Sequence, residues 1–219
     1  MKKLKNLKKD IKSVIFDLDG TLVDAYEAII QSVNFTLKKL DYKEALPKRV
    51  RLAVGWGDRK LLGAFIKGQD LNSALAIYRR HHRITLKRYS KLLPGAKELL
   101  EYLKQRDFKT AIASNRPTEF TNIILRRLGL RKYFDYVLCA DKLPKGKPHP
   151  EILFRIMKKL KVEPREVIYV GDMTVDVETA RNAGVKSIAV LGGSSSLAEI
   201  KKAKPFKILK SSAFLKKYL

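Results

Sequence analysis

The chain has 219 residues, of which 45% are hydrophobic and 32% are charged, a mixture typical of a globular protein with a buried core. Its single cysteine, Cys139, excludes an intrachain disulfide, and no run reaches the ~20 apolar residues that a membrane span needs. We therefore expect a cytoplasmic protein without a membrane partner, either a monomer or a homodimer.

The charge is strongly positive, because 47 Lys and Arg face 22 Asp and Glu, which gives a formal net charge of +25. Such a surplus favours anionic partners such as nucleic acid, a membrane surface or an acidic substrate. However, the positive residues are spread over the whole chain, without a zinc-finger, basic-zipper or RNA-binding aromatic motif. A solvated, lysine-rich surface is the simpler interpretation, and nucleic-acid binding stays an alternative.

Short apolar runs alternate with helical patterns along the chain. The expected strands are 14–16, 110–113, 137–140, 167–170 and 187–191, with a short edge strand at 206–209. Helical patterns follow residue 93, with apolar faces such as Leu99, Leu100 and Leu103. This alternation predicts an α/β fold, with a parallel sheet covered by helices on both faces.

Residues 25 to 91 interrupt the alternation. They carry helical patterns around 28–40, 60–66 and 71–89, and no convincing strand. We interpret them as a helical insertion between the first strand and the rest of the sheet.

Two pairs of aspartates follow expected strands. Asp17 and Asp19 follow strand 14–16, and Asp172 and Asp176 follow strand 167–170. Ligands of parallel sheets bind beyond the carboxyl ends of the strands, so both pairs are expected at one edge. Four carboxylates there repel each other, and a divalent cation removes the conflict. Because the candidate ligands are all oxygens, Mg²⁺ is favoured over zinc.

Polar groups that suit a phosphoryl group follow the same strands. Gly20 permits a tight turn and close approach of backbone N–H groups, and Thr21 adds a hydroxyl. Ser114 and Asn115 follow strand 110–113, and Lys147 follows strand 137–140. A hydroxyl, backbone amides and an ammonium group suit phosphoryl oxygens. Each motif alone is common in loops, but here all of them fall after expected strands.

These motifs resemble those of the haloacid dehalogenase-like hydrolase superfamily, in particular its phosphoglycolate phosphatase-like members. They stand as Asp17-Leu18-Asp19-Gly20-Thr21-Leu22-Val23-Asp24, Ser114-Asn115, Lys147-Pro148-His149-Pro150 and Gly171-Asp172-Met173-Thr174-Val175-Asp176. The resemblance spans roughly residues 13–193 and implies a Rossmann-like core with an inserted helical cap. The expected domains are a discontinuous core, 1–23 and 93–219, and a cap, 24–92.

The resemblance also implies roles for the motif residues. Asp17 would attack phosphorus and form an aspartyl-phosphate, Asp19 would act as general acid and then base, and Lys147 would orient Asp17. The expected phosphate-binding residues are Gly20, Thr21, Ser114, Asn115 and Lys147. The expected Mg²⁺ ligands are Asp17, the main-chain carbonyl of Asp19, Asp172, and Asp176 directly or through water.

The implied function is hydrolysis of small phosphate monoesters, phosphoglycolate-like or sugar phosphates. Haloacid dehalogenases lack the residue that stands here as Asp19, which argues against that chemistry. One alternative is a phosphosugar mutase with the same nucleophile, although Thr21 stands where mutases usually have Val. The other is a basic, nucleic-acid-associated protein that kept the fold. After Ser114-Asn115 the family often has Lys, where Arg116 stands here.

Cap residues select the leaving group in this family, and segment 54–60 is the best candidate for that role. Trp56 would form an apolar wall and Arg59 would bind a second anionic group. The alternative is a helix-capping turn with Trp56 as a core anchor. His81 and His82 are expected on a solvated, basic helix face rather than as a catalytic pair.

Overall fold

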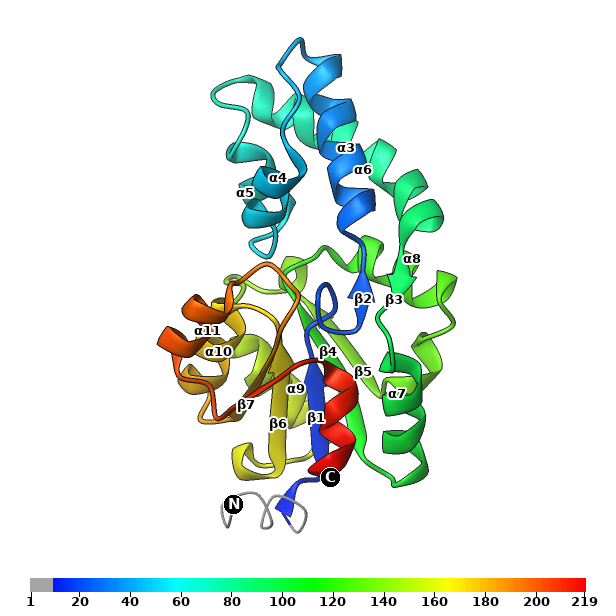
Figure 1. The fold of residues 1–219 in the computed structure, drawn as a ribbon, viewed down its shortest axis with the longest axis vertical. Coiled ribbons are helices and arrows are strands. Elements are labelled where there is room, and N and C mark those ends of the chain that lie inside the picture. The colour runs from blue at the N-terminus through cyan, green and yellow to red at the C-terminus, as the bar shows by residue number, and fades with distance from the viewer. Residues whose placement is uncertain (1–9) are drawn as a thin grey trace.

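The computed structural model describes residues 10–219; residues 1–9 of the expected core lie outside the described residues. Its six-stranded sheet has the order β5-β4-β1-β6-β7-β8, and every neighbouring pair is parallel (Figure 1). The strands are β1 (Ser13–Phe16), β4 (Lys109–Ser114), β5 (Tyr136–Cys139), β6 (Val167–Gly171), β7 (Lys186–Val190) and β8 (Lys207–Leu209). The predicted parallel α/β fold is confirmed.

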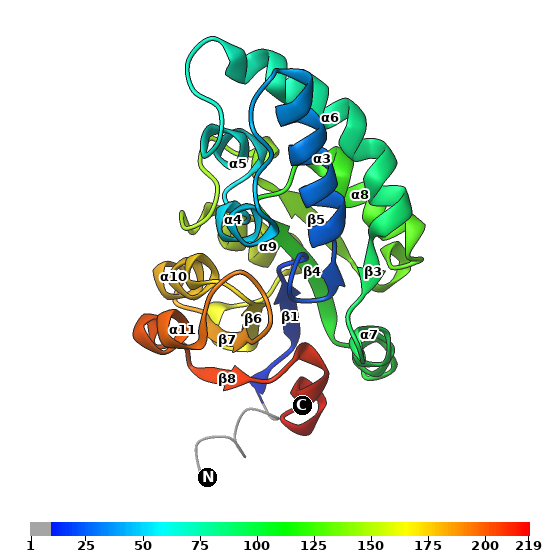
Figure 2. The ribbon, with the colours of Figure 1, turned by 45° about the horizontal axis from the view of Figure 1, so that its top comes forward.

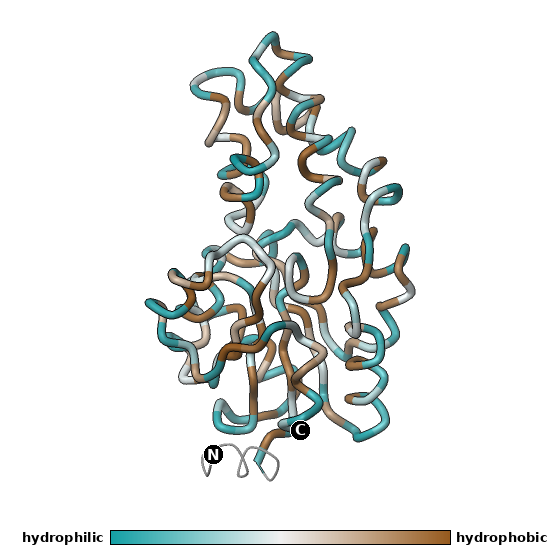
Figure 3. Tube along the Cα trace, viewed as in Figure 1, coloured by the Kyte–Doolittle hydropathy of each residue, from teal (hydrophilic) through white to brown (hydrophobic). Residues whose placement is uncertain are grey.

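Strand β1 is buried along its whole length, so its alternating side chains enter two separate cores. Val14 and Phe16 belong to the core that includes residues of α7 (Ala96–Gln105) and α8 (Thr118–Arg127). Ile15 belongs to the opposite core, with residues of α9 (Glu151–Leu160) and α10 (Thr174–Asn182). The hydrophobic strands therefore lie inside a more polar shell (Figure 3). Helix α11 (Leu197–Ala203), which was not predicted, packs against α10.

Four helices lie beyond the carboxyl ends of the strands (Figures 1 and 2). They are α3 (Tyr26–Lys39), α4 (Pro47–Ala53), α5 (Asp58–Gly63) and α6 (Asp70–Tyr89). The long helices α3 and α6 pack side by side. Helix α4 was not predicted, because only Val50 of its seven residues is buried and the sequence there shows no apolar periodicity.

The chain enters and leaves this helical group through a small antiparallel ribbon. Strand β2 (Val23–Asp24) pairs with β3 (Lys91–Leu92), and neither strand was predicted. The ribbon lies where the sequence analysis places the boundaries of the cap, and the division into two domains stays a prediction. Among the helices of residues 10–219, none combines the length and apolar character that crossing a membrane requires.

Candidate active site

The central strands β4, β1 and β6 bring the predicted motifs together. Phe16 at the end of β1 lies between Ile112 and Val170 in the parallel ladders. The next residue, Asp17, donates its backbone N–H to Val170 at 2.8 Å. Loops that follow neighbouring parallel strands therefore meet at one edge of the sheet, as expected.

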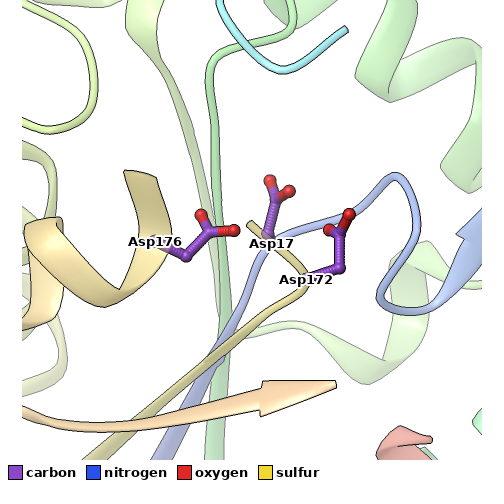
Figure 4. A group of neighbouring side chains, drawn as sticks. All are labelled: Asp17, Asp172 and Asp176. Atoms are coloured by element: carbon purple, nitrogen blue, oxygen red, sulfur yellow. The ribbon is translucent and has the colours of Figure 1, made fainter. Parts of the chain in front are cut away.

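Three buried carboxylates meet there. Ligand oxygens of Asp17, Asp172 and Asp176 lie within 4.8 Å of one another, and the three side chains point into a common space (Figure 4). Burial raises the pKa of Asp172 well above its usual value, and the charges of Asp176 and Asp17 add to the rise. Burial also raises the pKa of Asp17, to about 6, although Lys147 opposes the rise. A divalent cation would relieve this repulsion, so an oxygen donor set of this kind fits one.

Lys147 provides the positive charge of the cluster. Its ammonium nitrogen lies 2.9 Å from Asp17 Oδ1 and 2.6 Å from Asp176 Oδ1, and it donates to the Tyr169 hydroxyl at 3.0 Å. Burial would lower the pKa of Lys147, but the charges of Asp17 and Asp176 hold it well above its usual value. Lys147 therefore stays charged and holds the two carboxylates in place.

Asp172 is held by two loops. Its carboxylate accepts hydrogen bonds from Thr21 Oγ1 at 3.1 Å and from the backbone N–H of Ser194 at 3.0 Å. Gly20 and Gly193 pass so close that an added Cβ would lie 2.5 Å and 1.8 Å from Asp172 Oδ2. Thr21 and Gly20 were expected to bind phosphate. In this structure the Thr21 hydroxyl bonds Asp172, and Gly20 turns with φ +75° beside the same carboxylate, while phosphate binding by these two residues stays a prediction.

Asn115 connects the core to the segment before α5. Its Nδ2 donates to the Gly55 carbonyl at 2.9 Å, and its Oδ1 accepts from the Lys147 backbone N–H at 2.8 Å. Its neighbour Ser114 is buried at the cavity wall, where its hydroxyl accepts from the Arg116 backbone N–H at 3.2 Å. The Asn115 amide therefore positions two loops, whereas Ser114 lines the same cavity as Asp17.

Asp19 forms a bidentate ion pair that was not predicted. Arg116 donates to its carboxylate through Nε at 2.7 Å and through Nη2 at 2.9 Å. Arg116 Nη1 lies 2.8 Å from Nε2 of His82, which is fully buried on α6. The expectation that His82 lies on a solvated face is therefore wrong, because this face of α6 packs over the core. His81 is half-buried and stacks on Phe35.

A cavity lies over these groups. Segment 54–58 and α5 contribute Val54, Gly55, Gly57, Asp58 and Leu61 to its wall. The predicted segment thus faces the site, but neither Trp56 nor Arg59 is among the residues that line this cavity. Trp56 lies between two glycines of positive φ and lines a neighbouring cavity, with Lys60 over its ring. Arg59 is exposed and donates to Asn72 at 3.0 Å.

The sequence matches the family model of the haloacid dehalogenase-like hydrolases over residues 14–190. The chain belongs to this family. It is 33% identical to a phosphoglycolate phosphatase of Aquifex aeolicus over 183 residues, 84% of this chain and 86% of the relative. It is 32% identical to a phosphorylated carbohydrates phosphatase of Thermotoga maritima, over 81% of this chain and 84% of the relative. The crystal structure of a predicted phosphoglycolate phosphatase from Haemophilus somnus superposes with a TM-score of 0.91 and 27% identity, over 95% and 98% of the two chains.

Three groups at the site of this family member were missed by sequence reasoning. The Tyr169 hydroxyl touches both Lys147 and Asp176, at 3.0 and 2.9 Å. Ser194 donates its backbone N–H to Asp172 at 3.0 Å. His82 contacts Arg116 from α6. Tyr169 was detectable as a polar group in a fully buried strand, where its hydroxyl must find a partner.

Proposed function

We propose that this protein is a metal-dependent phosphatase that hydrolyses small phosphate monoesters, with Asp17 as its nucleophile. The proposal rests mainly on one arrangement. Asp17 lines the cavity while Lys147 lies 2.9 Å from its Oδ1, with Asp172 and Asp176 beside it. The phosphatase names of similar proteins support the same reaction class.

The formal charges of the site support a divalent cation. Asp17, Asp19, Asp172 and Asp176 contribute four negative charges, and Lys147 and Arg116 contribute two positive charges. The remaining two negative charges match one Mg²⁺. Carboxylates of Asp17 and Asp172 and the main-chain carbonyl of Asp19 would hold it, and Asp176 would act directly or through water. Bound Mg²⁺ would supply Lewis-acid stabilisation of the phosphoryl oxygens.

The residues then divide the reaction into two steps. Asp17 forms a bond to phosphorus as the bond to the leaving oxygen breaks, and Asp19, protonated in the substrate complex rather than ionised as in the resting site, gives that oxygen its proton. Asp19 next takes a proton from water, which attacks the aspartyl-phosphate, restores Asp17 and releases inorganic phosphate. Lys147 keeps Asp17 oriented, and Ser114 offers its hydroxyl to a phosphoryl oxygen.

The experiment is phosphate release from a panel of small esters, including a chromogenic aryl phosphate, phosphoglycolate and sugar phosphates. Each ester is tested with Mg²⁺, with EDTA and with Asp17→Asn. We expect turnover that requires Mg²⁺ and disappears in Asp17→Asn. No phosphate release by the folded protein would contradict the proposal, and interconversion of sugar phosphates without release would favour a mutase.

A further inference from the structure

We propose that Arg116 binds a second anionic group, a carboxylate or a second phosphate, on the leaving group of the substrate, and that His82 positions it. The inference rests on the proposed phosphatase function and specifies its substrate class. The preferred substrates are then small phosphate monoesters whose leaving group is itself negatively charged.

The first argument is the hydrogen-bonding capacity of Arg116. A guanidinium group has five N–H donors and cannot lose its charge in a protein. Nε and Nη2 each donate once to Asp19, and Nη1 donates once to His82. Two N–H groups of this buried side chain, which lines the cavity, have no partner among the described residues. A carboxylate or phosphate could accept both of them.

The second argument is the distribution of positive charge around the cavity. Among the described residues that line it, only Arg116 and Lys147 are cationic. Lys147 already faces Asp17 and Asp176. The acidic group of segment 54–58, Asp58, is paired with Arg79 at 2.7 Å, which offsets its repulsion of an anion. Arg116 is itself paired with Asp19, but it keeps two N–H groups, whereas Lys147 directs its three donors to Asp17, Asp176 and Tyr169. Arg116 is therefore the partner that a second anion would find.

The third argument is the side of the site on which Arg116 lies. It is bonded to Asp19, the proposed acid for the leaving oxygen, whereas Asp17 and Lys147 hold the transferred phosphoryl group. An anion that reaches Arg116 while the phosphoryl group lies at Asp17 thus belongs to the leaving group. The preference for a second anion would therefore determine which leaving alcohol the protein accepts.

His82 holds Arg116 without cancelling its charge. Because arginine only donates, Nε2 of His82 accepts, and the ring proton lies on Nδ1, which is 3.1 Å from Ser32 Oγ. Burial lowers the pKa of His82 well below its usual value, and the Arg116 charge lowers it further, so the ring stays neutral. The anion-binding residue of the core is therefore positioned by a helix of the insertion.

The test compares three phosphate esters that share a two-carbon chain. Phosphoglycolate carries a carboxylate, ethylene glycol bisphosphate carries a second phosphate, and 2-hydroxyethyl phosphate carries a neutral hydroxyl. We expect the protein to favour one of the anionic esters over the neutral ester in kcat/KM. Arg116→Gln should reduce this preference about 10- to 100-fold, the range for loss of charge-assisted hydrogen bonds. Arg116→Lys should retain part of it, and Arg80→Gln, at an exposed position of α6, should leave it unchanged.

The ratio of kcat/KM for the favoured anionic ester to kcat/KM for the neutral ester separates this role from a general loss of activity caused by disturbing Asp19. Phosphate release with an unchanged ratio in Arg116→Gln would overturn the inference and leave the phosphatase proposal standing. If Arg116→Gln does not fold, His82→Leu should lower the ratio while His82→Gln, which keeps an acceptor, should preserve it. Equal ratios in these two variants would also overturn the inference.

Binding gives a readout that does not depend on turnover. In the Asp17→Asn background, calorimetry should show that Arg116→Gln weakens the favoured anionic ester about 10- to 100-fold more than the neutral one. If no ester is hydrolysed yet this difference in affinity is found, the phosphatase proposal fails and the anion site stands. Equal weakening of all esters would overturn the anion site.

Discussion

The ammonium nitrogen of Lys147 lies 2.9 Å from Oδ1 of Asp17, and both residues are more than nine-tenths buried. Burial raises the pKa of Asp17, and Lys147 opposes that rise, so that the pKa stands at about 6 and the carboxylate can be ionised at neutral pH. The pair also links the loops that follow β1 and β5, which are separated in the sheet by β4.

Replacement of this ammonium group should damage both activity and stability. Lys147→Met leaves Asp17 and Asp176 as buried charges without their cation, so we expect a loss of about 3–5 kcal/mol in the free energy of unfolding without metal. The kcat should fall about 100- to 1,000-fold. Chemical denaturation and phosphate release measure the two effects. Lys145→Met, at an exposed position two residues away, is the matched control, and equal losses in both variants would contradict the interpretation.

Because Gly193 lies so close to Asp172, adding a single methyl group at position 193 should weaken metal binding. In Gly193→Ala the Cβ would lie 1.8 Å from Asp172 Oδ2, so the carboxylate must move. We expect Mg²⁺ affinity to fall about 10- to 100-fold, as for disturbed outer-shell groups. Calorimetry with Mg²⁺ measures it. Gly63→Ala is the control, because a Cβ there meets nothing within 4 Å. Unchanged Mg²⁺ affinity in Gly193→Ala would exclude Asp172 as an essential ligand.

Mg²⁺ binding should weaken in acid. Metal ligands must be deprotonated, and the pKa of Asp17 is raised to about 6 in the metal-free protein. Protons therefore compete with the metal below pH 6, where the apparent Kd should rise about tenfold per pH unit. Calorimetric titrations from pH 5 to pH 8 give this dependence. A constant Kd between pH 5 and pH 7 would show that Asp17 does not hold the metal.

His82 should make the fold less stable as the pH falls. Its pKa is well below the usual 6.5 in the folded protein, so below pH 6.5 the unfolded chain binds a proton that the folded chain does not. The stability contributed by the neutral ring is complete above pH 6.5. It should decline by about 1.4 kcal/mol per pH unit below that value, until the folded-state pKa is reached.

The matched variant is His82→Gln, which keeps an acceptor for Arg116 but does not titrate in this range. Unfolding free energies of both proteins are measured in saturating Mg²⁺, so that the carboxylates of the metal site do not add their own pH dependence. The difference in unfolding free energy between the unmodified protein and His82→Gln should shrink as the pH falls from 6.5 to 5. Parallel pH dependences would show that His82 is not buried as a neutral ring.

The strands and the convergence of the motifs were predictable from local sequence. Short apolar runs mark the buried strands of the main sheet, and Asp17, Asn115 and Asp172 directly follow β1, β4 and β6. Parallel pairing then brings these residues to one edge by topology alone. Helix α4 was not predictable in this way, since it buries a single residue.

The sequence by itself thus determined the fold class, the edge of the sheet at which the site lies, and the acidic residues gathered there. Only the tertiary structure decided which partner each polar side chain takes. Thr21 bonds Asp172 across 151 residues, and Arg116 meets His82 across 34. Such pairings depend on how α6 and the loops pack over the core. Local periodicity records which face of an element is apolar, but it does not record what that face will contact.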